Sequence, residues 1–378
     1  MSSIDREMRY LVRPQGVCPG ISIAYGNKVT SVTKQIGSDG AGNLLDETTL
    51  FDLASITKFF LALIYLKLSE LNIIDLEASI GMYTNAFNKI SHLKIKHMLS
   101  YNVDLYTPQR IDEYDNYEDA YRVLQLVEGQ YSEVQRYSDI PAIILAEVLF
   151  YTTGKTYGEW VYEIIVNPLH LETTGWDDNF FKDKKICSYA NEMWLFDDKV
   201  IVKNNPIGIV NDPKARILSN NSKILCGHAG LFTSTKDIIK ILQEILNERI
   251  IQKESLFLLA QGSGWDLSGK NQSFGFQCYR KINDDRQTEV PLFLSDRAIA
   301  SSGYTGCYLV IDPINDIFAF VGGNRLNNSI CKNMSSIKVS TEYFEASQKK
   351  YRTSLNYVYD RDKLRDVLCN SALLLKNL

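Results

Sequence analysis

The sequence is organised around the stretch Phe51-Asp52-Leu53-Ala54-Ser55-Ile56-Thr57-Lys58-Phe59-Phe60, which opens an apolar run that continues through Leu66. This run predicts a buried helix that begins near Ser55. Ser55 and Lys58 are three residues apart, so their side chains share one helix face at its N-terminus. The free N–H groups of a first helical turn stabilise negative charge. The stretch therefore predicts a nucleophilic serine beside a lysine.

The surroundings of Lys58 bear on its chemistry. An apolar environment disfavours the charged ammonium, which lowers the lysine pKa and favours its use as a base. The four-residue pattern alone is weak, because average composition produces it about once or twice in a chain of this length. The alternative is that Ser55 caps the helix and Lys58 is an ordinary surface lysine. The rest of the sequence decides between the two.

Length and composition exclude several classes of protein. With 378 residues, 45% of them hydrophobic, the chain can bury a large core. A net charge of −4 without a basic cluster argues against a nucleic-acid partner. No apolar run approaches 18 residues, so no membrane span is expected. Charges in residues 1–9 do not suit a signal peptide, and a cytoplasmic location is expected.

The cysteines and histidines give no sign of a metal or redox centre. The seven cysteines are scattered without a C-x-x-C pair, and the four histidines lack ligand spacing. Buried or free thiols in a reducing compartment are expected. The loop from Gly37 to Gly42 lacks the glycine patterns that hold phosphates. No metal and no cofactor are predicted.

Strand patterns lie near both ends of the chain, and helical patterns lie between them. Gly20–Tyr25 and Val29–Thr33 are predicted to form a hairpin. The expected helical segments, apart from the one at Ser55, are a solvated insert over 109–135, Ile140–Leu149 ended by Gly154, Tyr157–Ile165 and Ile238–Leu246. The later expected elements are strands at Phe274–Tyr279, Cys307–Asp312 and Ile317–Val321, and a final helix over about 361–377.

This order predicts an α+β fold. An antiparallel sheet built from both chain ends, flanked by helices, with a mostly helical part inserted, is the simplest arrangement. We expect a single domain over 1–378. Its sheet subdomain would comprise about 1–60 and 265–378, and its helical subdomain about 61–264.

Further motifs follow the Ser55 stretch in a fixed order. They are Arg136-Tyr137-Ser138-Asp139 before an apolar helix, Pro168–Gly175, Asn211–Ala215 and Gly227–Phe232. With these motifs the chain, from about Gly20 to Asn324, resembles the serine β-lactamase and penicillin-binding-protein superfamily. Within it, the chain is most similar to class C-like esterases and D-aminopeptidase-like hydrolases, in which S-x-x-K carries the nucleophile. The resemblance implies the same α+β fold and a small ester, amide or peptide substrate.

The resemblance also implies roles for individual residues. Ser55 would be the nucleophile that forms an acyl-enzyme, and Lys58 would share the proton handling. Tyr137, hydrogen-bonded to Lys58, would act as general base and then as acid. Asp139 stands where the family usually has asparagine. It either forms a salt bridge with Lys58, raising the lysine pKa, or caps the following helix, and both readings stay open.

Two histidines are assigned structural roles. His228 is attractive as a triad base, but its neighbours resemble a structural turn of the family. His97 is predicted to be an ordinary helix residue.

The third motif departs from the family pattern. Ser301-Ser302-Gly303 stands in place of Lys-Thr-Gly or His-Thr-Gly. Gly303 would keep the backbone close, and the N–H groups of Tyr304 and Ser55 would form an oxyanion hole. No cation replaces the family's Lys or His, so efficient β-lactam hydrolysis or D-Ala-D-Ala carboxypeptidase activity is not expected. Arg297 and Arg325 are the candidates for supplying a charge nearby.

Two functions are consistent with these residues. The first is a metal-independent serine hydrolase or acyltransferase acting through a Ser55 acyl-enzyme. The second is a catalytically silent binding or assembly protein that keeps the fold. The missing cation and Asp139 favour the second, whereas the intact Ser55, Lys58 and Tyr137 favour the first. Neither predicts a nucleic-acid or membrane partner, and the oligomeric state is not predicted.

Overall fold

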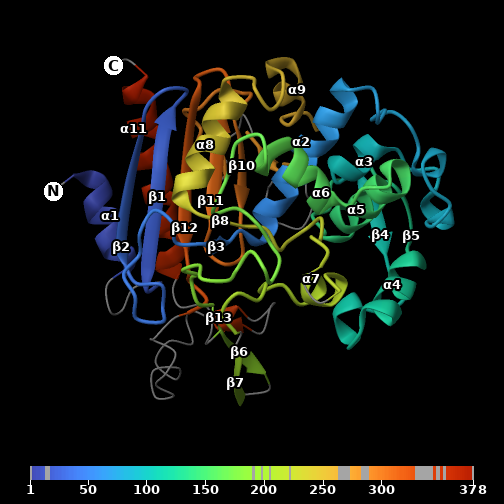
Figure 1. The fold of residues 1–378 in the computed structure, drawn as a ribbon, viewed down its shortest axis with the longest axis horizontal. Helices are drawn as coiled ribbons and strands as arrows, with labels where there is room; N and C mark the ends of the chain where they lie inside the picture. Colours follow the sequence, from blue (N-terminus) through green and yellow to red (C-terminus); the bar gives the residue numbers. More distant parts are fainter. Residues whose placement is uncertain are drawn as a thin grey trace.

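A six-stranded antiparallel sheet forms the centre of the fold, with strand order β2-β1-β12-β11-β10-β9 (Figure 1). The computed structural model describes residues 2–12, 18–189, 192–196, 199–203, 206–220, 223–262, 273–281, 289–327, 344–345, 350–351 and 355–376. The sheet strands are β1 (Gly20–Asn27), β2 (Ser31–Gly37), β9 (Tyr279–Arg280), β10 (Ile299–Ser302), β11 (Tyr308–Asp312) and β12 (Ile317–Gly323).

The pairing of β1 with β12 joins the two ends of the chain. It runs from Ile21 opposite Gly323 to Asn27 opposite Ile317. The expected sheet from both chain ends is therefore confirmed. β1 is buried along nearly its whole length, which its run of apolar and small residues permits. The predicted hairpin is also present, with both strands longer than their sequence patterns indicated.

Helices cover both faces of this sheet (Figure 1). On one face, α1 (Ser3–Val12) and α11 (Leu355–Leu375) share a core with β1 and β12, and α8 (Thr235–Leu246) packs against the other face. The sequence analysis did not predict α1, although its buried residues recur at helical spacing. The final helix was predicted and begins six residues earlier than expected.

The remaining helices form a group beside the sheet, to the right in Figure 1. They are α2 (Thr57–Glu70), α3 (Ile95–Leu99), α4 (Tyr117–Gln125), α5 (Ile140–Thr153), α6 (Tyr157–Val161), α7 (Pro213–Leu218) and α9 (Lys253–Leu258). Short 3₁₀ turns lie at Ala54–Ile56, Ile80–Met82, Asn88–Ile90 and Ile111–Glu113, and a π turn at Tyr162–Val166 continues α6. α2 is buried on almost every side, as expected for a helix that is apolar all round. α5 ends at Gly154, whose φ of 73° forms the left-handed cap that the sequence indicated.

Smaller sheets complete the described elements. β3 (Phe51–Asp52) pairs with β8 (Phe232–Thr233), and β4 (Val103–Tyr106) pairs with β5 (Glu128–Tyr131). A separate four-stranded sheet contains β6 (Glu192–Phe196), β7 (Lys199–Lys203), β13 (Phe344–Glu345) and β14 (Lys350–Tyr351).

Two sequence expectations are wrong in detail. The insert over 109–135 is helical at α4, but its later part is β5, because the edge of β4 offers backbone partners that the sequence pattern does not reveal. The strand expected over Phe274–Tyr279 begins only at Tyr279. The Gln135 side chain accepts a hydrogen bond from Phe274 N at 3.0 Å and donates one to Phe274 O at 2.7 Å. Phe274 pairs with Tyr279 only as an isolated bridge, so the two residues do not belong to one continuous strand.

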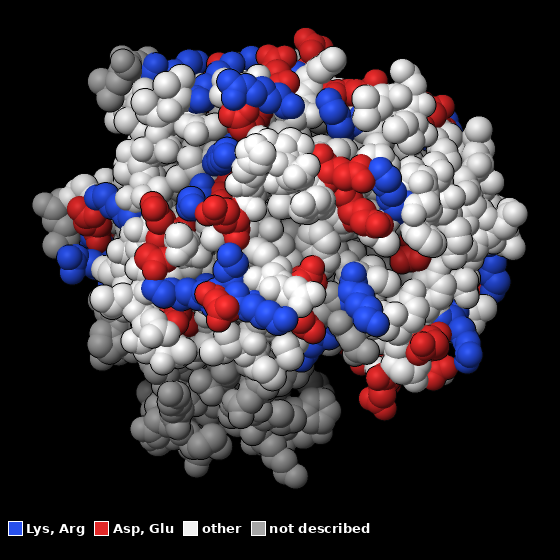
Figure 2. All heavy atoms as spheres, in the orientation of Figure 1, with Lys and Arg blue, Asp and Glu red and all other residues white. Residues whose placement is uncertain are grey.

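Acidic and basic side chains are interleaved on the face of the molecule that Figure 2 shows. Among the described helices, none combines the length and the apolar character that crossing a membrane requires.

Phe59 tests the packing of α2. Its side chain is fully buried and meets the Phe60 ring edge to face, with centroids 5.5 Å apart. Phe59→Ala should lower the free energy of unfolding by about 3–5 kcal/mol through lost burial and the remaining cavity. Urea-induced unfolding measures this change in the free energy of unfolding. Phe150→Ala is the matched control, since Phe150 is 47% exposed and should change stability by less than about 1 kcal/mol. Equal losses in the two variants would contradict the packing described for α2.

Candidate active site

Ser55 lies in the 3₁₀ turn Ala54–Ile56, two residues before α2 begins. Ala54 has a φ of 46°, a conformation that is uncommon for residues with a side chain. Asp52 holds this turn in place: its Oδ1 accepts the N–H of Ala54 and its Oδ2 accepts that of Asn211, both at 2.8 Å. Burial raises the pKa of Asp52 to about 6. The turn that carries Ser55 is thus fixed by a buried carboxylate that the sequence analysis did not identify.

Lys58 connects the residues for which catalytic roles were predicted. Its side chain is 1% exposed, and its Nζ donates to Ser55 Oγ at 2.8 Å and to Tyr137 OH at 3.1 Å. It also lies 3.4 Å from the carbonyl oxygen of His228. The i, i+3 spacing therefore does place the hydroxyl beside the ammonium. The catalytic roles of these residues stay predictions.

Tyr137 reaches Lys58 from the segment between β5 and α5. Its ring packs in an aromatic cluster, with centroid distances of 5.3 Å to Tyr101, 5.5 Å to Phe274 and 6.5 Å to Tyr279. Tyr137 remains 41% exposed. The cluster therefore fixes the ring while leaving it accessible from outside.

Asp139 occupies the N-cap position of α5, but its side chain makes no capping hydrogen bond. Its Oδ1 lies 2.9 Å from Lys58 Nζ, and its Oδ2 lies 3.0 Å from Lys214 Nζ. The sequence left open whether Asp139 caps α5 or forms a salt bridge with Lys58, and the structure shows the salt bridge. Burial lowers the pKa of Lys58, but Asp139 and Tyr137 outweigh it and the net shift is upward. The expectation of a lowered Lys58 pKa is wrong, because the apolar run did not reveal the carboxylate.

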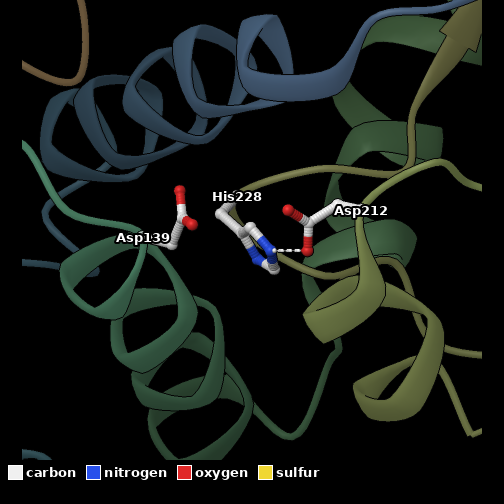
Figure 3. A group of neighbouring side chains, drawn as sticks. All are labelled: Asp139, Asp212 and His228. Carbon is white, nitrogen blue, oxygen red and sulfur yellow. Dashed lines mark hydrogen bonds and ion pairs between the residues drawn. The ribbon is translucent and has the colours of Figure 1, made fainter. Parts of the chain in front are cut away.

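His228 and Asp212 form a second ion pair beside Asp139 (Figure 3). His228 Nε2 lies 2.8 Å from Asp212 Oδ1, which also accepts the N–H of Ala215 and so caps α7. Burial lowers the pKa of the 1% exposed His228, but Asp212 outweighs it and raises that pKa to about 10. His228 therefore carries a proton at neutral pH, which makes it unsuited to act as a triad base.

The group Asp139, Asp212 and His228 also contains the ligand types of a metal site, since one donor atom from each lies within 4.8 Å of the others (Figure 3). Both oxygens of Asp139 already face ammonium groups, those of Lys58 and Lys214. A divalent cation would meet the repulsion of these ammonium groups and of protonated His228. The group therefore does not fit a metal centre and is better described as an internally neutralised ionic network.

Sequence reasoning missed Lys214. Lys214 lies in the motif Asn211–Ala215, two residues after Asp212, which caps α7. Its position as a charged residue within one of the ordered motifs could have marked it as a candidate site residue.

The third motif lies at the end of β10. Ser301 is buried and shares a strand face with Ile299, which belongs to the same core as α2, whereas Ser302 lies on the opposite face. Ser301 therefore lies on the face of β10 that packs in the α2 core. A Cβ added to Gly303 would lie 2.5 Å from Leu53 O, so only glycine allows this close approach. Thr305 Oγ1 donates to Asp52 O at 2.6 Å and connects the same loop to the segment before Ser55.

The two candidate arginines lie in different places. Arg325 stacks on the Tyr304 ring, 4.7 Å from its centroid, and its Nε donates to Tyr304 O at 2.5 Å. Arg297 packs on Phe257 instead. Arg325 is therefore the cation beside the third-motif loop. The oxyanion hole of Tyr304 and Ser55 N–H groups stays a prediction.

Gly303→Ala tests the close approach of this loop. The added methyl group would force the loop away from Leu53, so we expect the rate of Ser55 acylation to fall at least about tenfold. The second-order rate of labelling by a fluorophosphonate measures it. Ser69→Ala, near the C-terminal end of α2, is the control, and its rate should stay within about twofold of wild type. An unchanged rate in folded Gly303→Ala would show that the approach does not matter for reactivity.

An antiparallel sheet with helices on both faces, and a Ser-x-x-Lys turn leading into a buried helix, define the β-lactamase and penicillin-binding-protein class of folds. The Beta-lactamase family profile matches residues 4–329. The chain belongs to the Beta-lactamase family, as the ordered motifs indicated.

Curated relatives and solved structures agree with this assignment. The chain is 25% identical over 292 residues to an N-acetylmuramyl-L-alanine amidase of Bacillus subtilis, covering 70% of this chain and 65% of that protein. It is 27% identical over 145 residues to a teichoic acid D-alanine hydrolase of Staphylococcus aureus, covering 38% and 36% respectively. The matches thus span less than two thirds of the length of these relatives.

The structure of EstCE1, a hydrolase with promiscuous acyltransferase activity, superposes with a TM-score of 0.66 at 15% identity, covering 87% of this chain and 98% of that one. At this identity the likeness shows the fold alone, and it confirms the predicted α+β class.

Proposed function

We propose that the protein is a serine hydrolase or acyltransferase that acts on a small ester or amide through an acyl-enzyme at Ser55. The observation that carries this proposal is the chain of contacts from Ser55 Oγ through Lys58 Nζ to Tyr137 OH, at 2.8 and 3.1 Å. A hydroxyl, an ammonium and a phenol within hydrogen-bond reach are the parts of an activated nucleophile.

The reaction follows from these positions. Acylation starts from the form of the site that has lost one proton, with Tyr137 as phenolate beside the Lys58 ammonium. As Ser55 Oγ attacks the substrate carbonyl carbon, its proton passes to Lys58 Nζ, and Lys58 gives one of its protons to the Tyr137 oxygen. The bond to the leaving oxygen or nitrogen then breaks, and Tyr137 returns the proton to the leaving group. Water, or a second alcohol or amine, attacks the acyl-enzyme and releases Ser55. The half-exposed Tyr137 is suited to contact both the leaving group and the incoming nucleophile.

Similarity to other proteins supports an ester or amide substrate. The named relatives are an amidase and a D-alanine hydrolase, and EstCE1 combines hydrolase and acyltransferase activity. We infer that an acyl or D-alanyl ester, or the corresponding amide, is a suitable substrate class. The serines of the third motif offer no cation for a substrate carboxylate, and the Arg325 guanidinium beside this loop is engaged by the ring and the carbonyl oxygen of Tyr304. This disfavours β-lactams as substrates.

The alternative is a catalytically silent binding or assembly protein. The observation that favours it is the same lack of a family Lys or His in Ser301-Ser302-Gly303. A silent protein has no need of an activated serine, so reactivity at Ser55 separates the two functions.

Exposure to a fluorophosphonate tests the proposal. We expect the intact mass of the protein to rise by one adduct, mapped by peptide sequencing to Ser55, and a panel of acyl and D-alanyl esters to be hydrolysed. A folded protein that gains no adduct and hydrolyses none of the panel would overturn the proposal and favour the silent alternative.

A further inference from the structure

A second lysine, Lys214, contacts the same carboxylate as Lys58, the proposed catalytic lysine. Asp139 is shared, with Oδ1 at 2.9 Å from Lys58 Nζ and Oδ2 at 3.0 Å from Lys214 Nζ. Lys214 comes from the first turn of α7, where its Nζ also lies 4.0 Å from Asp212 Oδ2. Its side chain is 24% exposed, so it belongs to the partly buried wall of the site.

The charged and titratable groups around Asp139 come from several elements. The groups around Asp139 are Lys58 from α2, Tyr137 from the preceding segment, Tyr101 after α3, Lys214 and Asp212 at α7, and His228 before β8. Asp112 also acts on Lys214, and Cys226 on His228. Asp139 is the carboxylate that two of these cations share, since Lys58 faces one of its oxygens and Lys214 the other.

Without Lys214 the balance would be different. Asp139 would then have Lys58 as its one lysine partner, and its Oδ2 would lose the ammonium group that faces it. A carboxylate so committed would compete with the Tyr137 oxygen for the same ammonium. This is the difficulty that an aspartate in place of asparagine raises for the proposed mechanism.

We propose that Lys214 is a positioning residue that holds one oxygen of Asp139 and so leaves the positive charge of Lys58 available to the Tyr137 oxygen during acylation. The inference rests on the proposed function and deepens it. It explains how a chain with Asp139 at this position keeps a reactive Ser55: the extra negative charge is matched by an extra cation from α7.

The pH dependence of Ser55 labelling tests this role. Acylation needs the network to release a proton, and removal of one positive charge makes that release less favourable. For Lys214→Met, the acidic limb of the labelling rate should therefore move to higher pH by about one unit. The rate at pH 6.5 should fall about tenfold, while the rate at pH 9 stays within about twofold of wild type.

Matched variants separate charge from structure. Lys214→Gln is a second neutral variant should Lys214→Met fail to fold, and Lys214→Arg should restore the wild-type profile. Lys236→Met is the control, because Lys236 pairs with Glu172 on the surface and should leave the profile unchanged. Thermal unfolding confirms that each variant is folded.

The outcomes distinguish the two proposals. A wild type that labels, with an unmoved profile in folded Lys214→Met and Lys214→Gln, would overturn the role of Lys214 and leave the proposed function intact. A loss equal at every pH would mean a structural role and would also overturn it. A wild type that does not label at any pH would remove the proposed function and this inference together.

Discussion

Replacing Ser55 by alanine is expected to abolish covalent labelling and to lower ester hydrolysis by at least about 10³-fold. Lys58 and Tyr137 keep their hydrogen-bond partners in each other, yet no oxygen remains to attack the carbonyl. The side chain removed is small and only half-buried, so the protein should stay folded. Intact-protein mass after fluorophosphonate treatment and kcat/KM on an aryl ester measure the two effects.

Ser69→Ala is the control for this experiment. Ser69 lies in the same helix, near the far end of α2 from the Ser55 turn. Its labelling and turnover should match those of the wild type. An adduct that persists in Ser55→Ala would assign the reactivity to another residue and would contradict the site described above.

The second large effect is expected for Tyr137→Phe. The ring would stay in its aromatic cluster with Tyr101 and Phe274, while the hydroxyl that lies 3.1 Å from Lys58 Nζ is removed. Loss of a general acid–base group lowers rates by about 10²–10⁴-fold, so kcat should fall by that amount with little change in KM. Steady-state kinetics on the same aryl ester gives both constants.

Tyr131→Phe is the matched tyrosine control. Tyr131 is 46% exposed and contacts the ring of His97, outside the Lys58 network. Its kinetic constants should stay within about twofold of wild type. A Tyr137→Phe variant with wild-type kcat would show that Lys58 handles the proton without the phenol, and the proposed mechanism would need Lys58 as its base.

Local sequence patterns were enough for much of the fold. The β1–β2 hairpin, α2 and the Gly154 cap of α5 follow from alternation, apolar runs and turn residues within a few positions. The sheet from both ends followed from the order of elements along the chain. Structure that depends on residues distant in sequence was missed. β5 forms by pairing with β4, and the backbone of Phe274 bonds to the side chain of Gln135, and neither partner is visible in the local sequence pattern.

The sequence by itself determined that Ser55 and Lys58 lie together in the candidate site. Ser55 and Lys58 are neighbours on one turn because their spacing of three residues makes them so in any helix. The ordered motifs also determined the family, and with it the class of fold. These features depend on short separations and on the order of motifs, which a sequence displays directly.

Only the tertiary structure decided the electrostatics of the site. Asp139, Lys214 and His228 come from α5, α7 and the segment before β8, and packing brings their charged groups to about 3 Å from their partners. At such distances in a buried site, Coulomb attraction outweighs the desolvation that an apolar run suggests. The direction of the Lys58 pKa shift therefore depends on three-dimensional neighbours that the sequence pattern around Lys58 does not contain.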